Sequence, residues 1–353
     1  MKLFHNTIIN LCFTKIKRCG KICHVSFFRR VNARMKNLSL SRTSAKKYYI
    51  ALLFVIFIWG LDPLIMSFFY KYYSATALTA LGSFFSLLMF LIITLKKRVK
   101  IDKRYLKIAV PIAVINSVAC LLQKIGLQYT TPANYAFLEH LSCVVVPLTV
   151  WIAAKKRPSL SQSLAGFVCI AGCFILCGAD IGTSSGGVGN ILCAAAGILL
   201  GVAVAAIGIY ARELDKILYV SVYMGVYFII SIISIPILNF ITVGGVPMEK
   251  LRFSFSFPII TLAILFGLLS TGLCWLIKNT AIIHTDPTAV AVISPLSAVI
   301  SGVLSVGLGL DKLTPNLLIG STVILLAIII SGTGEKIGEK IKRKKGANGK
   351  TAS

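Results

Sequence analysis

Ten apolar runs, each long enough to cross a lipid bilayer as a helix, constrain this chain more than any other feature. The hydrocarbon core takes about 20 apolar residues of helix, and the runs are about 18 to 23 residues long. They lie near residues 48–69, 75–95, 106–127, 132–153, 160–178, 188–210, 217–240, 258–279, 287–308 and 313–333. Because a helix satisfies its own backbone hydrogen bonds in lipid, we expect an all-α membrane protein with ten transmembrane helices.

The basic residues are distributed as the positive-inside rule predicts for such a protein. Of the 37 Lys and Arg residues, 31 lie in the two tails or beside alternate connections between the runs. The remaining connections hold only Lys71, Lys250, Arg252 and Lys312. We therefore expect a multi-pass protein of the cell (plasma or inner) membrane with both termini in the cytoplasm. The net charge of +26 then reflects topology and attraction to lipid headgroups, and we expect no nucleic acid partner.

Two basic segments flank the apolar runs. Residues 1–47 form a basic N-terminal tail without a secretory signal, and residues 334–353 form a basic C-terminal tail. We expect translation to begin at Met35, which would make residues 1–34 a misassigned start. The alternative is an amphipathic anchor at the membrane surface that uses Phe27 and Phe28.

An internal duplication relates the fourth run to the ninth. Y-T-T-P-A-N-Y-A-F-L-E-H-L-S-C-V from Tyr129 matches H-T-D-P-T-A-V-A-V-I-S-P-L-S-A-V from His284 at six positions. Chance similarity between two apolar stretches is the alternative. We interpret residues 48–185 and 186–333 as two repeats of five helices each. An odd number of helices per repeat makes the repeats insert with opposite orientations, which is typical of transporters that work by alternating access.

Ionisable side chains inside apolar runs are candidate functional residues, because each costs about 2.5 to 3.5 kcal/mol at mid-membrane unless it lines a cavity or has a partner. Asp62 stands in W-G-L-D-P, where Gly60 and Pro63 favour a local helix break. It either lines a polar cavity, with Trp59 as part of the wall, or caps the amides freed by the break. We favour the cavity.

Glu139 and His140 are adjacent in the fourth run, so they point about 100° apart and are not expected to face one spot. They could exchange protons in a wet cavity or simply contact neighbouring helices. Lys124 and Lys278 stand 154 residues apart, the spacing of the two repeats, and would suit an anionic substrate group. The alternative, which we favour, is that both snorkel to the membrane surface.

Other polar and aromatic side chains have simpler interpretations. We expect His284 to be solvated in a cytoplasmic turn, and Trp275 to belong to an interfacial belt of aromatic residues. Asp286 has the same interpretation as His284. The cysteines lie mostly in apolar runs, so we expect no disulfide framework and no metal site.

The combined pattern resembles the EamA-type transporters of the drug/metabolite transporter superfamily over residues 48–333. The resemblance rests on Trp59-Gly60, Y-T-T-P-A from Tyr129, I-S-P-L at Ile293–Leu296, K-K-R-P-S-L-S from Lys155 and G-F-V-C-I-A-G from Gly166. It implies a ten-helix fold around a central cavity that exports or exchanges small metabolites, often against protons. His140 stands where this family often has proline, Leu81-Gly82-Ser83 where arginine is common, and Asp62 where a neutral residue is usual. These departures leave the substrate and the coupling ion open.

We therefore expect a secondary transporter of a small polar metabolite or drug-like compound, with two inverted five-helix repeats and no enzymatic activity or cofactor. Its partners would be the substrate, the lipid bilayer and, as a coupling ion, protons, whereas a monomer and a homodimer remain equally open. The candidate residues for substrate binding or proton coupling are Trp59, Asp62, Lys124, Glu139, His140 and Lys278. The alternatives are an intramembrane enzyme acting on a lipid-linked substrate and a non-transporting scaffold or sensor.

Overall fold

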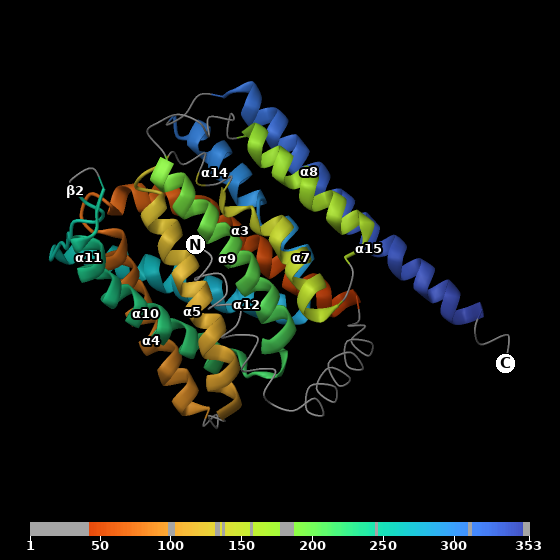
Figure 1. The fold of residues 1–353 in the computed structure, drawn as a ribbon, viewed down its shortest axis with the longest axis horizontal. Helices are drawn as coiled ribbons and strands as arrows, with labels where there is room; N and C mark the ends of the chain where they lie inside the picture. The colour runs from red at the N-terminus through yellow and green to blue at the C-terminus, as the bar shows by residue number, and fades with distance from the viewer. Residues whose placement is uncertain are drawn as a thin grey trace. The chain divides into compact units, whose positions relative to one another are not determined.

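The computed structural model describes residues 42–97, 103–130, 135, 138–155, 158–176, 187–243, 246–309 and 313–348 (Figure 1). The chain divides into a first unit, Met1–Lys47, and a second, Tyr48–Ser353, which is the helical body of the protein. The predictions for Met35, Phe27 and Phe28 lie outside the described residues.

The described residues form helices and one short hairpin, joined by loops. The elements are α3 (Arg42–Phe69), α4 (Ala75–Lys96), α5 (Lys103–Gly126), α7 (Ser142–Ala154), α8 (Leu160–Leu176), α9 (Gly187–Tyr210), the 3-10 helix η1 (Ala211–Glu213), α10 (Lys216–Phe240), β1 (Thr242–Val243), β2 (Val246–Pro247), α11 (Phe257–Phe266), the π-helix η2 (Gly267–Leu273), α12 (Cys274–His284), α13 (Pro287–Ile293), α14 (Leu296–Gly307) and α15 (Pro315–Asn348). The strands β1 and β2 pair antiparallel.

The described helices include seven segments that are long and apolar enough to cross a membrane. These are Lys47–Phe69, Ala75–Lys96, Leu106–Gly126, Gly187–Tyr210, Lys216–Phe240, Phe257–His284 and Pro287–Gly307. Shorter apolar helices at Ser142–Ala154, Leu160–Leu176 and Pro315–Ser331 occupy the expected fourth, fifth and tenth runs. The all-α membrane class is thus confirmed, whereas the count of ten spans stays a prediction.

The helix break expected at Pro63 does not form. Helix α3 continues through this proline from Arg42 to Phe69. Because proline has no amide hydrogen, the helix lacks one backbone hydrogen bond at Pro63. Close packing of α3 against a neighbouring helix accompanies this lost hydrogen bond. A Cβ atom on Gly60 would lie 2.7 Å from Ile300 Cγ2, so α3 lies directly against α14.

The fourth and ninth runs are interrupted instead, and at matching positions. Helix α7 begins only at Ser142, after a turn at His140 and Leu141. In the ninth run α13 ends at Ile293 and α14 begins at Leu296, the repeat counterpart of Leu141. Interrupted membrane helices are tolerated where their freed backbone groups face a cavity or find partners in the protein.

The helices pair in a way that is similar in the two halves. Helix α8 lies along α15, and α4 packs on α10, so the fifth run contacts the tenth and the second contacts the seventh (Figure 1). The contact of α10 with α5 joins the seventh run to the third, and the contact of α4 with η2 joins the equivalent second run to the eighth. Glycines permit close approach, since a Cβ on Gly320 would lie 2.5 Å from the Leu176 backbone nitrogen.

Candidate functional site

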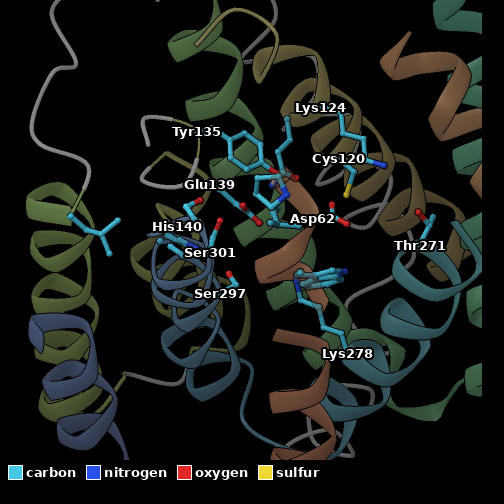
Figure 2. A pocket seen from close by; sticks show the side chains of 18 of the residues that line it. Asp62, Cys120, Lys124, Tyr135, Glu139, His140, Thr271, Lys278, Ser297 and Ser301 are labelled. Atoms are coloured by element: carbon cyan, nitrogen blue, oxygen red, sulfur yellow. Dashed lines mark hydrogen bonds between the residues drawn. The ribbon is translucent and has the colours of Figure 1, made fainter. Parts of the chain in front are cut away.

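A cavity of about 360 Å³ lies among helices from both halves of the chain (Figure 2). This volume lies within the range of about 300 to 1,000 Å³ that is typical of small-molecule sites. The described residues that line it are Trp59, Asp62, Pro63, Cys120, Gln123, Lys124, Tyr135, Glu139, His140, Leu176, Leu200, Tyr227, Thr271, Trp275, Lys278, Ser297, Ala298, Ser301, Gly302, Ser305, Val306, Thr314 and Leu317. The cavity is therefore large enough for a metabolite and has both charged and aromatic walls.

All six candidate residues from the sequence line this cavity: Trp59, Asp62, Lys124, Glu139, His140 and Lys278. The expectation that adjacent Glu139 and His140 would not share a site is wrong. The turn at His140 and Leu141 interrupts the regular helix there, so the angle of 100° per residue does not apply. Figure 2 shows Asp62, Glu139 and His140 close together in the middle of the view.

The side chain of Asp62 accepts a hydrogen bond from the neighbouring π-helix η2. The Ser270 hydroxyl donates to Asp62 Oδ1 over 2.6 Å, and the indole Nε1 of Trp59 donates to the Ser270 carbonyl over 3.3 Å. Lys124 lines the same cavity as this carboxylate. Asp62 thus contacts another helix and does not cap its own, which contradicts the capping alternative.

Lys278 is buried against two tryptophans. Its side chain is 5% exposed, and its Nζ lies 4.5 Å from the ring centroid of Trp59 and 4.9 Å from that of Trp275. An ammonium over an aromatic face at such distances is a cation–π contact. The snorkelling interpretation of Lys278 is therefore wrong, because its charge stays among the cavity walls.

Lys124 contributes the second ammonium group of the cavity. Its Nζ lies 6.0 Å from the ring centroid of Tyr227, and its backbone carbonyl accepts a hydrogen bond of 3.2 Å from the Tyr70 hydroxyl. Neither this ammonium nor that of Lys278 donates a hydrogen bond to any residue that the structure describes. Both lysines therefore keep donors for a ligand.

Sequence reasoning missed several lining residues. Trp275, expected at the membrane interface, is 7% exposed and lies 5.3 Å from Trp59 between ring centroids. Ser297, Ser301 and Ser305 follow one face of α14 at intervals of four, a helical spacing that could have revealed a polar wall. The role of Ser270 had no sequence signal, because it depends on which helix packs beside α3.

A network of polar contacts joins the helix ends around the turn between α12 and α13. Arg212 Nη2 donates to the Thr285 carbonyl over 3.3 Å, and Gln162 Nε2 donates to Asp286 Oδ2 over 2.7 Å. His284 Nε2 lies 2.8 Å from Lys216 Nζ. His284 and Asp286 are thus engaged with neighbouring helices, and the expectation that they are merely solvated is wrong.

This network lies at the start of the ninth run, away from the cavity-lining residues at the end of that run. The lining residues Val306, Thr314 and Leu317 stand at the α14–α15 end, whereas none comes from the turn that holds Thr285. Partial burial lowers the pKa of Arg212, and the nearby Asp286 carboxylate acts against that shift. The cavity therefore extends toward one end of the helices, and packed polar side chains occupy the other.

A buried acid outside the cavity, Glu249, lies in the connection between α10 and α11. It is 5% exposed, and its carboxylate accepts hydrogen bonds from the Thr76 amide at 3.2 Å and from Gln128 Nε2 at 3.0 Å. The Tyr129 hydroxyl donates to the neighbouring Met248 carbonyl. A carboxylate at the first turn of α4 satisfies an amide that the helix leaves free. Glu249 thus ties this connection to α4 and α5.

Buried cysteines bond to the backbone beside the interrupted ninth run. Pro295 has no amide hydrogen to donate to the Ala291 carbonyl, and the Cys143 thiol donates to that carbonyl over 3.0 Å. Cys169 Sγ lies 3.8 Å from the Val292 carbonyl. Within the ranges that the structure describes, no group of three or more His, Cys, Asp or Glu side chains is arranged to hold a metal ion.

The fold and the cavity define a multi-pass, all-α membrane protein with a small-molecule-sized site between its helices. Residues 46–178 match the EamA-like transporter family. The chain is 28% identical over 211 residues to an uncharacterized transporter of Archaeoglobus fulgidus, an alignment that covers 59% of this chain and 63% of that protein. These matches confirm the resemblance to EamA-type members of the drug/metabolite transporter superfamily.

The fold also resembles a solved structure. A protein crystal structure with 16% sequence identity superposes with a TM-score of 0.64, covering 83% of this chain and 99% of that one. At this identity the likeness concerns the fold alone.

Proposed function

We propose that this protein is a secondary transporter that moves a small polar metabolite across the membrane by alternating access. The observation that carries the proposal is the cavity, where charged and aromatic side chains from both halves of the chain meet. Charged groups inside apolar helices usually mark the path of a substrate or a proton. The match of residues 46–178 to the EamA-like transporter family and the similarity to an uncharacterized transporter support the same conclusion.

The side chains of the cavity divide into two chemical roles. Lys124 and Lys278, whose ammonium groups keep free donors, bind an anionic group of the substrate. Asp62 and Glu139 bind a cationic group or carry a coupling proton, and His140 assists one of them. Trp59 forms the wall beside Lys278.

Alternating access requires that the two ends of the cavity open in turn. Residues 48–185 and 186–333 form two inverted repeats. This proposal is supported by the breaks just before α7 and α14, whose positions in the two repeats agree to within one residue, and by the pairing of α4 with α10. With both termini in the cytoplasm, the end of the cavity that Thr314 lines faces outward. The contacts of Arg212 and Asp286 then belong to the inner gate, which must separate for the cavity to open inward.

The test has two stages. First, comparing metabolites released by cells with and without the protein identifies a substrate. Then, in proteoliposomes, Asp62→Asn and Glu139→Gln should abolish transport or flatten its dependence on pH. The proposal of their roles is wrong if both variants transport the substrate as the unmodified protein does at every pH.

A test of Lys278 needs a control variant that loses the same charge elsewhere, because the loss of a positive charge can alter transport by itself. Lys278→Met should weaken substrate binding, since it removes the ammonium between Trp59 and Trp275. Lys250→Met removes an equal charge from an exposed position outside the cavity and should transport normally. Equal transport by the two variants would argue against a substrate role for Lys278.

A further inference from the structure

Ser270 makes two contacts to the cavity face of α3, one through its side chain and one through its backbone. Its hydroxyl donates to Asp62 Oδ1 over 2.6 Å, and its carbonyl accepts from Trp59 Nε1 over 3.3 Å. Ser270 is 4% exposed and is absent from the cavity lining, whereas Asp62 and Trp59 both line the cavity. It therefore supports the two residues from behind.

The two carboxylate oxygens of Asp62 differ in their hydrogen bonding. Oδ1 receives the Ser270 hydroxyl, and no other residue that the structure describes donates to either oxygen. A carboxylate has about four acceptor positions, so most of this capacity stays available. With Oδ1 held at the helix interface, Oδ2 is the oxygen left for a proton or a substrate group in the cavity.

The backbone that carries Ser270 has an unusual geometry. Ser270 lies in η2, the π-helical segment Gly267–Leu273 between α11 and α12. A π-helix bonds residue i to i+5, so it holds an extra residue and rotates the next helical turns by about 100° relative to a continuous α-helix. π-Helical turns inside α-helices are frequent at functional sites. Here the segment determines which side chain faces Asp62.

Close packing against α4 holds this segment in place. A Cβ on Gly267 would lie 2.5 Å from Gly82 Cα, so the two backbones touch without intervening side chains. The Ser86 hydroxyl also donates to the Gly267 carbonyl over 3.4 Å. The π-helical segment that carries Ser270 is thus held against α4 by a close contact between the two backbones.

We propose that Ser270 is the positioning residue of Asp62: its hydroxyl holds one carboxylate oxygen and directs the other into the cavity. This inference rests on the proposed function, in which Asp62 binds substrate or carries a proton. The hydroxyl stabilises the charged carboxylate, because a carboxylate oxygen accepts a stronger hydrogen bond than an oxygen of the neutral carboxyl group. Without it, Asp62 takes up a proton at higher pH and is free to rotate.

Chemical labelling of Asp62 tests the proposal without any transport measurement. A hydrophobic carbodiimide reacts with protonated carboxyl groups, and peptide mass spectrometry reports the labelled fraction of Asp62 at each pH. In Ser270→Ala the midpoint of the labelling curve should move to higher pH by about one unit, the size expected for a hydrogen bond to a charged group.

Two further variants separate positioning from folding. Ser270→Thr retains the hydroxyl and should keep the midpoint of the unmodified protein. Ser234→Ala removes a hydroxyl that donates only to the Ile230 carbonyl of its own helix and should also leave Asp62 unchanged. If Ser270→Ala does not fold, Ser270→Cys, with its weaker donor, should give a smaller shift in the same direction.

The outcomes distinguish this proposal from the proposed function. An Asp62 midpoint that is equal in Ser270→Ala and in the unmodified protein overturns the positioning role, whether or not the protein transports. If the Asp62 midpoint shifts in Ser270→Ala but the unmodified protein shows no detectable transport, the role of Ser270 is supported and the proposed function is not. Where a substrate is known, the pH profile of transport should shift by the same amount as the labelling curve.

Discussion

Replacement of Gly197 by alanine should destabilise the protein, although alanine is the better helix former. A Cβ at this position of α9 would lie 2.2 Å from the Leu138 carbonyl oxygen and 3.1 Å from the Glu139 carbonyl oxygen. An ordinary contact is 3.4 to 4 Å, and both obstacles are backbone atoms that cannot rotate away. The helix and the segment before α7 must therefore separate by roughly 1 Å, in a core packed too densely to absorb that shift.

The magnitude follows from two opposing terms. Overpacking of this kind costs about 1 to 3 kcal/mol, and backbone obstacles favour the upper value. Alanine in place of glycine inside a helix stabilises the helix by about 0.8 to 1 kcal/mol. The net destabilisation of Gly197→Ala is then about 2 kcal/mol. Because the shift moves Glu139 relative to Lys278, transport should fall as well.

Thermal denaturation of the detergent-solubilised protein measures the effect at one fixed scan rate. The midpoint for Gly197→Ala should fall by a few degrees. Gly225→Ala is the matched control, since its Cβ would meet Leu87 Cδ1 at an ordinary 3.7 Å, and it should be neutral or slightly stabilising. Equal midpoints for the two variants would show that α9 does not approach Leu138 so closely.

Three further predictions concern particular contacts. Cys143→Val should lower stability by about 1 kcal/mol, because the Ala291 carbonyl loses its donor, whereas Cys143→Ser should retain it, as thermal denaturation of the pair can show. Glu249→Ala should lower the denaturation midpoint more than Lys250→Ala, since it leaves the buried Thr76 amide without an acceptor, at a cost of about 1 to 3 kcal/mol; equal midpoints would contradict this. Lys278→Met should raise the tryptophan fluorescence of the two indoles beside it, and this fluorescence should no longer change when substrate is added. A fluorescence spectrum equal to that of the unmodified protein would mean that the ammonium does not contact Trp59.

The sequence predicts the membrane class and the apolar segments well, because hydrocarbon thickness imposes a length and a composition on each helix. It also indicates the candidate residues, since a charge such as Asp62 is conspicuous in an apolar run. The position of helix breaks was harder to predict. Pro63 lies within a continuous helix packed on α14, whereas the fourth run is interrupted beside Leu141, which has no special backbone preference.

The contacts between helices were outside the reach of sequence reasoning. Nothing in the sequence shows that Ser270 meets Asp62, 208 residues away, or that two tryptophans enclose Lys278. Trp275 looked like an interfacial residue because it lies near the end of a run, yet neighbouring helices bury it. Such contacts depend on helix packing and on the π-helical turn of η2, which local composition does not encode.

Two halves that lie antiparallel in the membrane around one cavity are central to the proposed mechanism, and single-cysteine labelling tests this arrangement directly. Thr130 and Thr285 are equivalent positions of the two repeats. In a cysteine-depleted background, a membrane-impermeant maleimide added to intact cells should label Thr130→Cys and not Thr285→Cys, which only a permeant maleimide should reach. Labelling of both positions from outside, or of both only by the permeant reagent, would contradict the inverted arrangement and alternating access with it.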